Sequence, residues 1–102
     1  MTYKIIIPAR FGSSRLPGKP LSIIGDKPMI EHVWNRASES SADRIIVATD
    51  DPRIEQVCND FGAECLLTQK DHQSGSDRIV EVCKKLDFND NDIIVNLQGD
   101  EP

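Results

Sequence analysis

The chain has 102 residues, with 12 Lys and Arg against 17 Asp and Glu, and a formal net charge of −5. This length accommodates one small domain, and the 27 Leu, Ile, Val and Phe residues are enough to build its core. The longest aliphatic run, 45–48, is far shorter than the roughly 20 residues that span a bilayer. The composition argues against a membrane protein, a secreted mini-protein and a disordered tail, and the acidic balance argues against nucleic-acid binding.

The charge is distributed unevenly along the chain. Residues 1–42 carry a net charge of +3, whereas residues 43–102 carry −8. A locally basic segment in an acidic chain favours a small polyanionic ligand. The three cysteines are odd in number and lack a C-x-x-C spacing, so we expect reduced thiols in a cytoplasmic protein.

The hydrophobic pattern alternates between strand and helix signals along the chain. Short β-branched runs predict strands at 3–7, 44–48, 64–67 and 92–97. Apolar residues at the helical period predict intervening helices over 30–37, 54–61 and 79–86. This order predicts an α/β fold, a Rossmann-like and mostly parallel sheet with helices on both faces.

Proline, glycine and aspartate mark the predicted ends of the helices. Pro28 and Pro52 fall where a first helical turn tolerates proline, and Gly62 provides a C-terminal stop for the second helix. Asp50 and Asp51 are expected to cap the N-terminus of that second helix.

The connection between the first strand and the first helix, 9–27, is much longer than the usual ~2–6 residues. Part of it, 21–24, is a candidate extended piece before a turn at 25–26, and His32 is expected to have a structural role. The chain ends just after the fourth strand. We therefore expect a truncated fold, in which 1–102 forms the N-terminal nucleotide-binding portion of a single α/β domain that continues further.

Three polar clusters follow predicted strands, at 8–20, 49–51 and 98–102. Ligands of open parallel sheets bind beyond the carboxyl ends of the strands, so these clusters are expected to converge. In the last cluster, Asp100 and Glu101 are candidate ligands for a hard divalent cation such as Mg²⁺. Taken alone, however, acidic residues at a strand end are more often simply solvated.

The first cluster contains Arg10, Arg15 and Lys19 among Gly and Ser residues, a composition that suits phosphate oxygens. It differs from a P-loop, because five residues instead of four separate Gly12 from Gly18, and Pro20 replaces the Ser or Thr. No G-x-G-x-x-G fingerprint is present. A solvated basic loop is the alternative interpretation.

Segment 71–75, at the entry to the third helix, either contacts a nucleotide or only caps the helix. No Ser/His/Asp or Cys/His nucleophile set can be assembled, and no zinc-ligand spacing is present.

Five motif blocks, in order and in spacing, resemble those of the 3-deoxy-manno-octulosonate (KDO) cytidylyltransferases, also called CMP-KDO synthetases. The blocks are Pro8 to Leu21, Lys27 to Ile30, Ile46 to Asp50, Asp71 to Arg78 and Asn96 to Pro102. The resemblance implies a fold of the nucleotide-diphospho-sugar transferase type. It also implies that CTP and KDO react to give CMP-KDO and pyrophosphate, with Mg²⁺, in lipopolysaccharide biosynthesis, and that the full-length protein is a cytoplasmic homodimer.

The same resemblance implies roles for individual residues. The residues expected to act in catalysis are Arg15, Lys19 and Asp100, with Asp100 also the metal ligand. The residues expected to bind nucleotide or substrate are Ala9, Arg10, Arg15, Lys19, Gln73, Ser74, Arg78 and Gln98. Two alternatives remain open: a cytidylyltransferase for another sugar acid, and a non-catalytic nucleotide-binding fragment.

Overall fold

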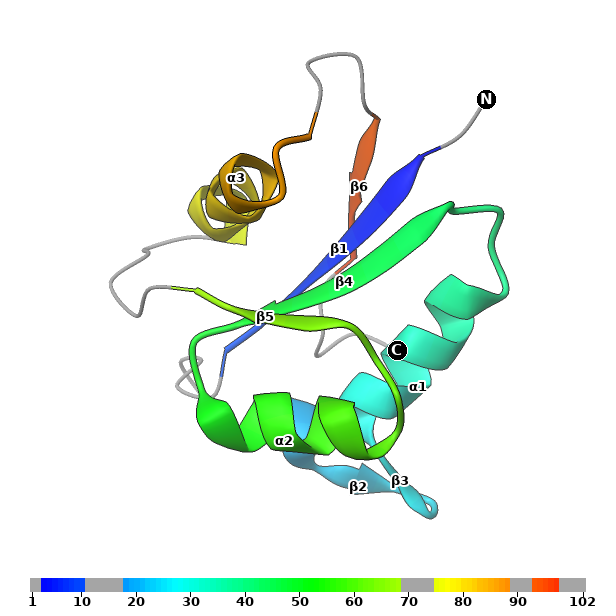
Figure 1. Ribbon diagram of the computed structural model, residues 1–102. Helices are drawn as coiled ribbons and strands as arrows, with labels where there is room; N and C mark the ends of the chain where they lie inside the picture. Colours follow the sequence, from blue (N-terminus) through cyan, green and yellow to red (C-terminus); the bar gives the residue numbers. More distant parts are fainter. Residues whose placement is uncertain (1–2, 11–17, 69–74, 89–92, 98–102) are drawn as a thin grey trace.

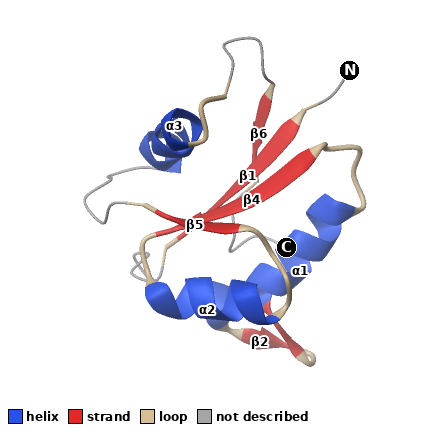
Figure 2. Ribbon diagram, viewed as in Figure 1, coloured by secondary structure: helices blue, strands red, loops and turns tan. Residues whose placement is uncertain are grey.

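The computed structural model describes residues 3–10, 18–68, 75–88 and 93–97 (Figure 1). Helices and strands alternate along these residues, as the sequence predicts (Figure 2). The elements are β1 (Lys4–Ala9), the 3₁₀ turn η1 (Lys19–Leu21), β2 (Ile23–Ile24), β3 (Lys27–Pro28), α1 (Met29–Ser38), β4 (Arg44–Thr49), α2 (Pro52–Asp60), β5 (Cys65–Leu67), α3 (Gly75–Lys85) and β6 (Ile94–Asn96).

The main sheet has the strand order β5-β4-β1-β6, and all of its pairings are parallel. β1 and β4 pair in register along their whole length, from Lys4 opposite Arg44 to Ala9 opposite Thr49. Parallel neighbours require crossover connections, which the helices supply. The structure therefore confirms the predicted α/β fold.

Helices cover both faces of the sheet. Successive side chains of each strand point to opposite sides, so the apolar strands place hydrophobic residues on both faces, and both faces must be buried. On one face, Ile5 and Ile7 belong to the core cluster that packs beneath α1 and α2. On the other face, Ile6 and Ile46 pack with Val82 of α3. Figure 1 shows α1 and α2 together on one side of the strands and α3 on the other.

The second helix begins and ends as its sequence predicts. Pro52 is its first residue, and the Asp51 side chain accepts a hydrogen bond of 2.8 Å from the backbone N–H of Arg53. At the other end, Gly62 adopts a positive φ of 85°, while the N–H of Ala63 donates to the carbonyl of Cys58 at 2.9 Å. This Schellman geometry satisfies backbone carbonyls that the helix leaves without partners.

The long connection after β1 contains η1 and a small antiparallel hairpin formed by β2 and β3. The predicted extended piece is thus confirmed over Ile23–Ile24, followed by the expected turn, in which Gly25 has a φ of 67°. His32 of α1 holds this hairpin, since its Nε2 donates to the carbonyl oxygen of Ile24 at 2.7 Å. The structural role expected of His32 is confirmed.

Pro28 stands one residue before α1 rather than inside the first turn of that helix.

Candidate functional site

The carboxyl ends of β1, β4 and β5 lie side by side at one edge of the sheet. Ala9 pairs with Thr49, and the N–H of Thr68 donates to the carbonyl of Thr49 at 2.7 Å. The next residues along the first two strands, Arg10 and Asp50, therefore leave the sheet as neighbours. Strand alternation then assigns side chains to the faces of the sheet.

Alternation places one polar side chain from each strand on the face that α3 covers. Ile6, Ile46, Ala48 and Leu66 all belong to or pack against the core cluster beneath α3. Counting onward in steps of two, the same face takes Arg10 from β1, Asp50 from β4 and Thr68 from β5. Three polar side chains are thus placed on the face of the sheet that α3 covers.

Arg78, in the first turns of α3, joins two of these side chains. Its side chain is completely buried, and its Nη2 lies 3.5 Å from Oδ2 of Asp50. Its Nη1 donates to the hydroxyl of Thr68, which itself donates to the carbonyl of Thr49 at 3.2 Å. A buried guanidinium is costly without a paired carboxylate, so Asp50 stabilises the buried Arg78.

This contact corrects the sequence prediction for Asp50. The sequence predicts that both Asp50 and Asp51 cap α2, but Asp51 alone provides the cap. Asp50 lies on the opposite face of the strand end and forms the ion pair with Arg78 instead. The physical reason is alternation, since two consecutive residues leaving a strand cannot both face the same helix.

Several charged groups act on Arg78 at this edge. Burial lowers the pKa of the Arg78 guanidinium, Asp50 raises it, and the nearby positive charge of Arg10 lowers it further. Glu81 also raises the pKa, although its carboxylate is shared with Lys85 at 2.7 Å. Arg10 and Arg78 thus bring two positive charges close together at this edge, and this arrangement favours an anionic ligand.

The structure describes four of the residues that the sequence predicts for the site. Ala9 is buried at the end of β1, Arg10 follows it half-buried, Lys19 begins η1, and Arg78 is buried against Asp50. The roles expected of these four residues stay predictions. Arg15, Gln73, Ser74, Gln98 and Asp100 lie outside the described residues.

Sequence reasoning missed Asp50 and Thr68 as partners of Arg78. A signal for both was present, because alternation within the apolar runs of β4 and β5 already assigns each residue to a face. The signal at Asp50 is obscured by the neighbouring Asp51 and Pro52, which together are typical of a helix start.

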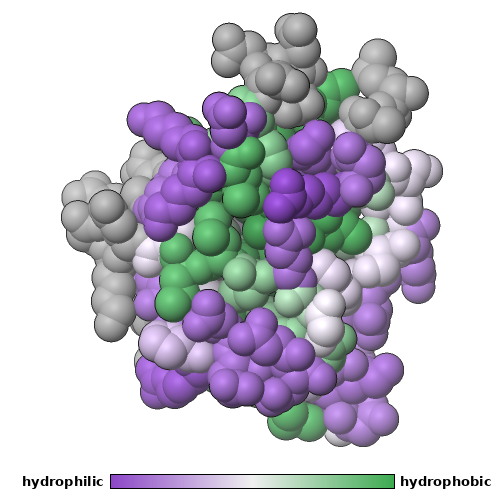
Figure 3. Space-filling view, viewed as in Figure 1, coloured by the Kyte–Doolittle hydropathy of each residue, from purple (hydrophilic) through white to green (hydrophobic). Residues whose placement is uncertain are grey.

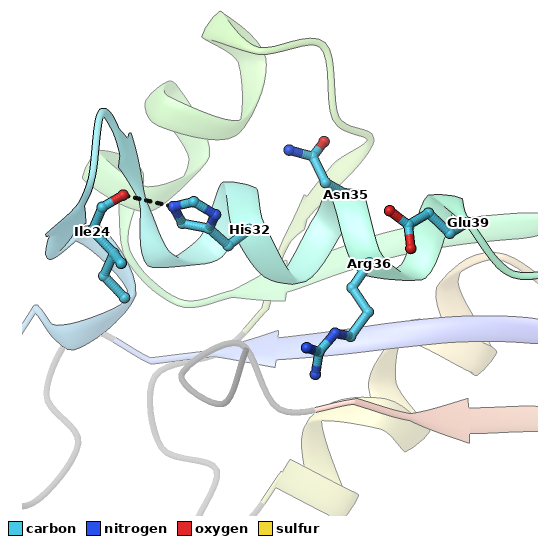
Figure 4. Close-up of a pocket in the computed structure, with 5 residues that line it drawn as sticks. All are labelled: Ile24, His32, Asn35, Arg36 and Glu39. Carbon is cyan, nitrogen blue, oxygen red and sulfur yellow. Dashed lines mark hydrogen bonds between the residues drawn. The ribbon is translucent and has the colours of Figure 1, made fainter.

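A second feature, a hollow of about 360 Å³, lies along the solvent side of α1 (Figure 4). Ile24, His32, Asn35, Arg36 and Glu39 line it. Its single acid and single base offer no excess charge, and the ring of His32 already bonds to Ile24. The hollow does not share the polar residues of the carboxyl edge.

Within the described part of the chain, no three His, Cys, Asp or Glu side chains gather closely enough to hold a metal ion. Among the same residues, no helix has the length and apolar character needed to cross a membrane. The three cysteines, all within the described residues, form no disulfide. Figure 3 shows hydrophobic side chains over the middle of the sheet and hydrophilic ones over α2.

Comparison with known proteins identifies similar chains. The 3-deoxy-manno-octulosonate cytidylyltransferase of Pseudomonas fluorescens (strain SBW25) is 58% identical over 98% of this chain and 39% of its own length. The enzyme of the same name from Pectobacterium carotovorum is 59% identical over 100% of this chain and 41% of its own length.

Two solved structures share the fold. A CMP:2-keto-3-deoxy-manno-octonic acid synthetase, solved in complex with CTP, superposes with a TM-score of 0.91 at 53% identity. It is matched over 100% of this chain and 42% of its own. A cytidylyltransferase from Leptospira borgpetersenii superposes with a TM-score of 0.76 at 28% identity, over 98% of this chain and 42% of its own.

The chain therefore spans about two fifths of the length of the relatives that it matches. The model of the family described as "Cytidylyltransferase" matches residues 4–102, which is nearly the whole chain. The chain belongs to the cytidylyltransferase family.

Proposed function

We propose that the full-length protein transfers a cytidylyl group from CTP to KDO, giving CMP-KDO and pyrophosphate. The observation that carries this proposal is the similarity over the whole chain to a synthetase solved with CTP. Curated relatives of the same name, at 58% and 59% identity, support the choice of KDO. The positive charge of Arg10 near the buried Arg78 supports a polyanionic substrate.

The reaction asks for positioning and charge stabilisation rather than for a protein nucleophile. In this proposal the anomeric hydroxyl of the sugar attacks the α-phosphorus in line, and pyrophosphate leaves. Arginine and lysine side chains stabilise the charge that develops on the phosphate oxygens. Arg10 is suited to this task, because it lies at the carboxyl edge of the sheet, where ligands of such folds bind.

The remaining residues of the proposed nucleotide site come from the family resemblance. They are Ala9, Arg10, Arg15, Lys19, Gln73, Ser74, Arg78 and Gln98. Of these, Arg78 also contacts Asp50 and Thr68 through its buried guanidinium.

We also propose that the reaction uses Mg²⁺, with Asp100 as one ligand. Asp100 lies outside the described residues, and Asp50, the carboxylate at the described edge, is engaged by Arg78. Activity that is abolished by a chelator and restored by added Mg²⁺, and not by Ca²⁺ at the same concentration, would support this assignment.

Three further parts of the proposal concern the setting of the enzyme. Its product would serve lipopolysaccharide biosynthesis, its location would be the cytoplasm, and its full-length form would be a homodimer. The three free thiols are consistent with a reducing compartment.

The decisive experiment measures pyrophosphate release by the full-length protein, with CTP and Mg²⁺, in parallel reactions with KDO and with a sialic acid. We expect pyrophosphate release in the reaction with KDO and none in the reaction with the sialic acid. Release only with the sialic acid would assign the enzyme to another sugar acid, and release with neither would favour a non-catalytic nucleotide-binding protein. In an active enzyme, Arg15→Ala and Asp100→Ala should each lower the rate by orders of magnitude without unfolding the protein.

A further inference from the structure

The positions of Arg10 and Asp50 at the carboxyl edge would favour an ion pair between them. They directly follow the paired residues Ala9 and Thr49 on strands that run about 4.8 Å apart. Alternation also turns both side chains toward the face covered by α3. With opposite charges, adjacent positions and a shared face, an ion pair between them is the arrangement that the two strands alone would favour.

The structure does not contain that pair. Oδ2 of Asp50 lies 3.5 Å from the guanidinium of Arg78, which descends from α3 and is completely buried. Among the described residues, no carboxylate lies within ion-pair distance of Arg10. The carboxylate nearest to Arg10 in register is thus held by a different arginine.

The difference in burial explains which arginine holds the carboxylate. Breaking a buried pair leaves a charge without compensation, whereas an exposed pair contributes little because water solvates both partners. Arg78 is buried and Arg10 is only half-buried, so Asp50 stabilises the protein more when it pairs with Arg78. The hydroxyl of Thr68 fixes the same guanidinium from the strand β5 side.

We propose that Arg78 is a positioning residue, which holds Asp50 away from Arg10 and so leaves the Arg10 guanidinium available for a phosphate group of the nucleotide. This inference rests on the proposed function. It assigns Arg78 a role that acts through Arg10 and needs no contact with the nucleotide. Burial lowers the pKa of Arg78 most, and the charge of Arg10 lowers it further, so an anion bound beside Arg10 would offset the repulsion between the two guanidinium groups.

The test uses CTP binding to the full-length protein, measured by calorimetry. In Arg78→Gln, Asp50 loses its partner and captures Arg10, so affinity for CTP should fall roughly tenfold, the value of one charge-assisted hydrogen bond. In the double variant Arg78→Gln with Asp50→Asn, the carboxylate that would capture Arg10 is removed. Affinity should then return to within about threefold of that of the unsubstituted protein.

Two control variants separate positioning from a general loss of structure. Arg78→Lys keeps a cation against Asp50 and should bind CTP more tightly than Arg78→Gln. Arg44→Gln removes the ion pair with Glu64, 2.6 Å long, at the opposite end of β4, and should leave CTP affinity unchanged. Thermal unfolding of each variant shows whether it is folded at the temperature of the binding measurement.

The outcomes distinguish the inference from the function on which it rests. Recovery of CTP affinity in the double variant supports the inference, because Arg78→Gln, shown by thermal unfolding to be folded, has then lost affinity through the unpaired carboxylate of Asp50 and not through lost structure. If the unsubstituted protein binds CTP but the double variant binds no better than Arg78→Gln, the inference is overturned and the proposed function stands. If the unsubstituted protein does not bind CTP, both are overturned.

Discussion

Val82 is the residue that anchors α3 to the sheet, and its truncation should loosen the helix that carries Arg78. Its side chain is completely buried in the cluster with Ile6, Ile46 and Ala48. Among the described residues, this cluster has four buried members, whereas the one beneath α1 and α2 has eleven. Val82 is the member that α3 contributes.

The cost of Val82→Ala follows from the atoms removed. Two buried carbons contribute about 1.6 kcal/mol at about 0.8 kcal/mol each, and the cavity adds roughly 1 kcal/mol. The higher helix propensity of Ala returns about 0.5 kcal/mol. The free energy of unfolding should therefore fall by about 2 kcal/mol, which lowers Tm by about 8–16 °C for a domain of this size.

Val80 provides the matched control, since it lies on the same helix but is 51% exposed. Val80→Ala removes little buried surface and gains helix propensity, so the free energy of unfolding should stay the same or rise by about 0.5 kcal/mol. Urea and thermal unfolding, followed by far-UV circular dichroism, measure both variants. Equal stability of Val82→Ala and Val80→Ala would refute the packing of α3 on the sheet through Val82.

Three other predictions concern local structure. Asp51→Ala removes the cap of α2 and should lower the free energy of unfolding by about 1 kcal/mol in urea titrations. Gly62→Ala should cost a similar amount, about 1 kcal/mol, because an L residue is strained at a φ of 85°, even though a methyl group at this position would meet no atom within 4 Å. The hydrogen bond with Cys58, and then burial, raise the pKa of the Cys65 thiol. The stabilising effect of this neutral thiol is complete below its ordinary pKa of 9.0 and is lost as the pH rises above it, so unfolding titrations of Cys65→Ala should show a weaker decline in alkali.

Much of the fold could be predicted because burial imposes two distinct periods on the sequence. The run Ile5 to Ile7 fills both faces of the sheet, so it has no polar alternation and is typical of a central parallel strand. The pair Ile23–Ile24 was harder to assign, because these side chains are 65% and 41% exposed and the hydrophobic pattern therefore carries little information. Their strand exists through backbone pairing with Lys27 and Pro28.

The candidate site was predictable where a residue follows a strand directly and unpredictable where it depends on a distant partner. Arg10 could be placed at the carboxyl edge because β1 leads straight to it. The contact of Arg78 with Asp50 depends on how α3 crosses the far face of the sheet, which no local pattern encodes.

Asp50 and Asp51, at the end of β4, contact helices on opposite faces of the sheet. Val47 packs beneath α2 while Ile46 and Ala48 pack beneath α3, so continued alternation sends Asp51 toward α2 and Asp50 toward α3. Asp51 meets backbone N–H groups and completes a helix start, whereas Asp50 meets a buried cation. If Asp50 faced α2 instead, Arg78 would lose this carboxylate. The alternation of side chains along β4 therefore places Asp50 against Arg78, which in our proposal leaves the positive charge of Arg10 available to a ligand.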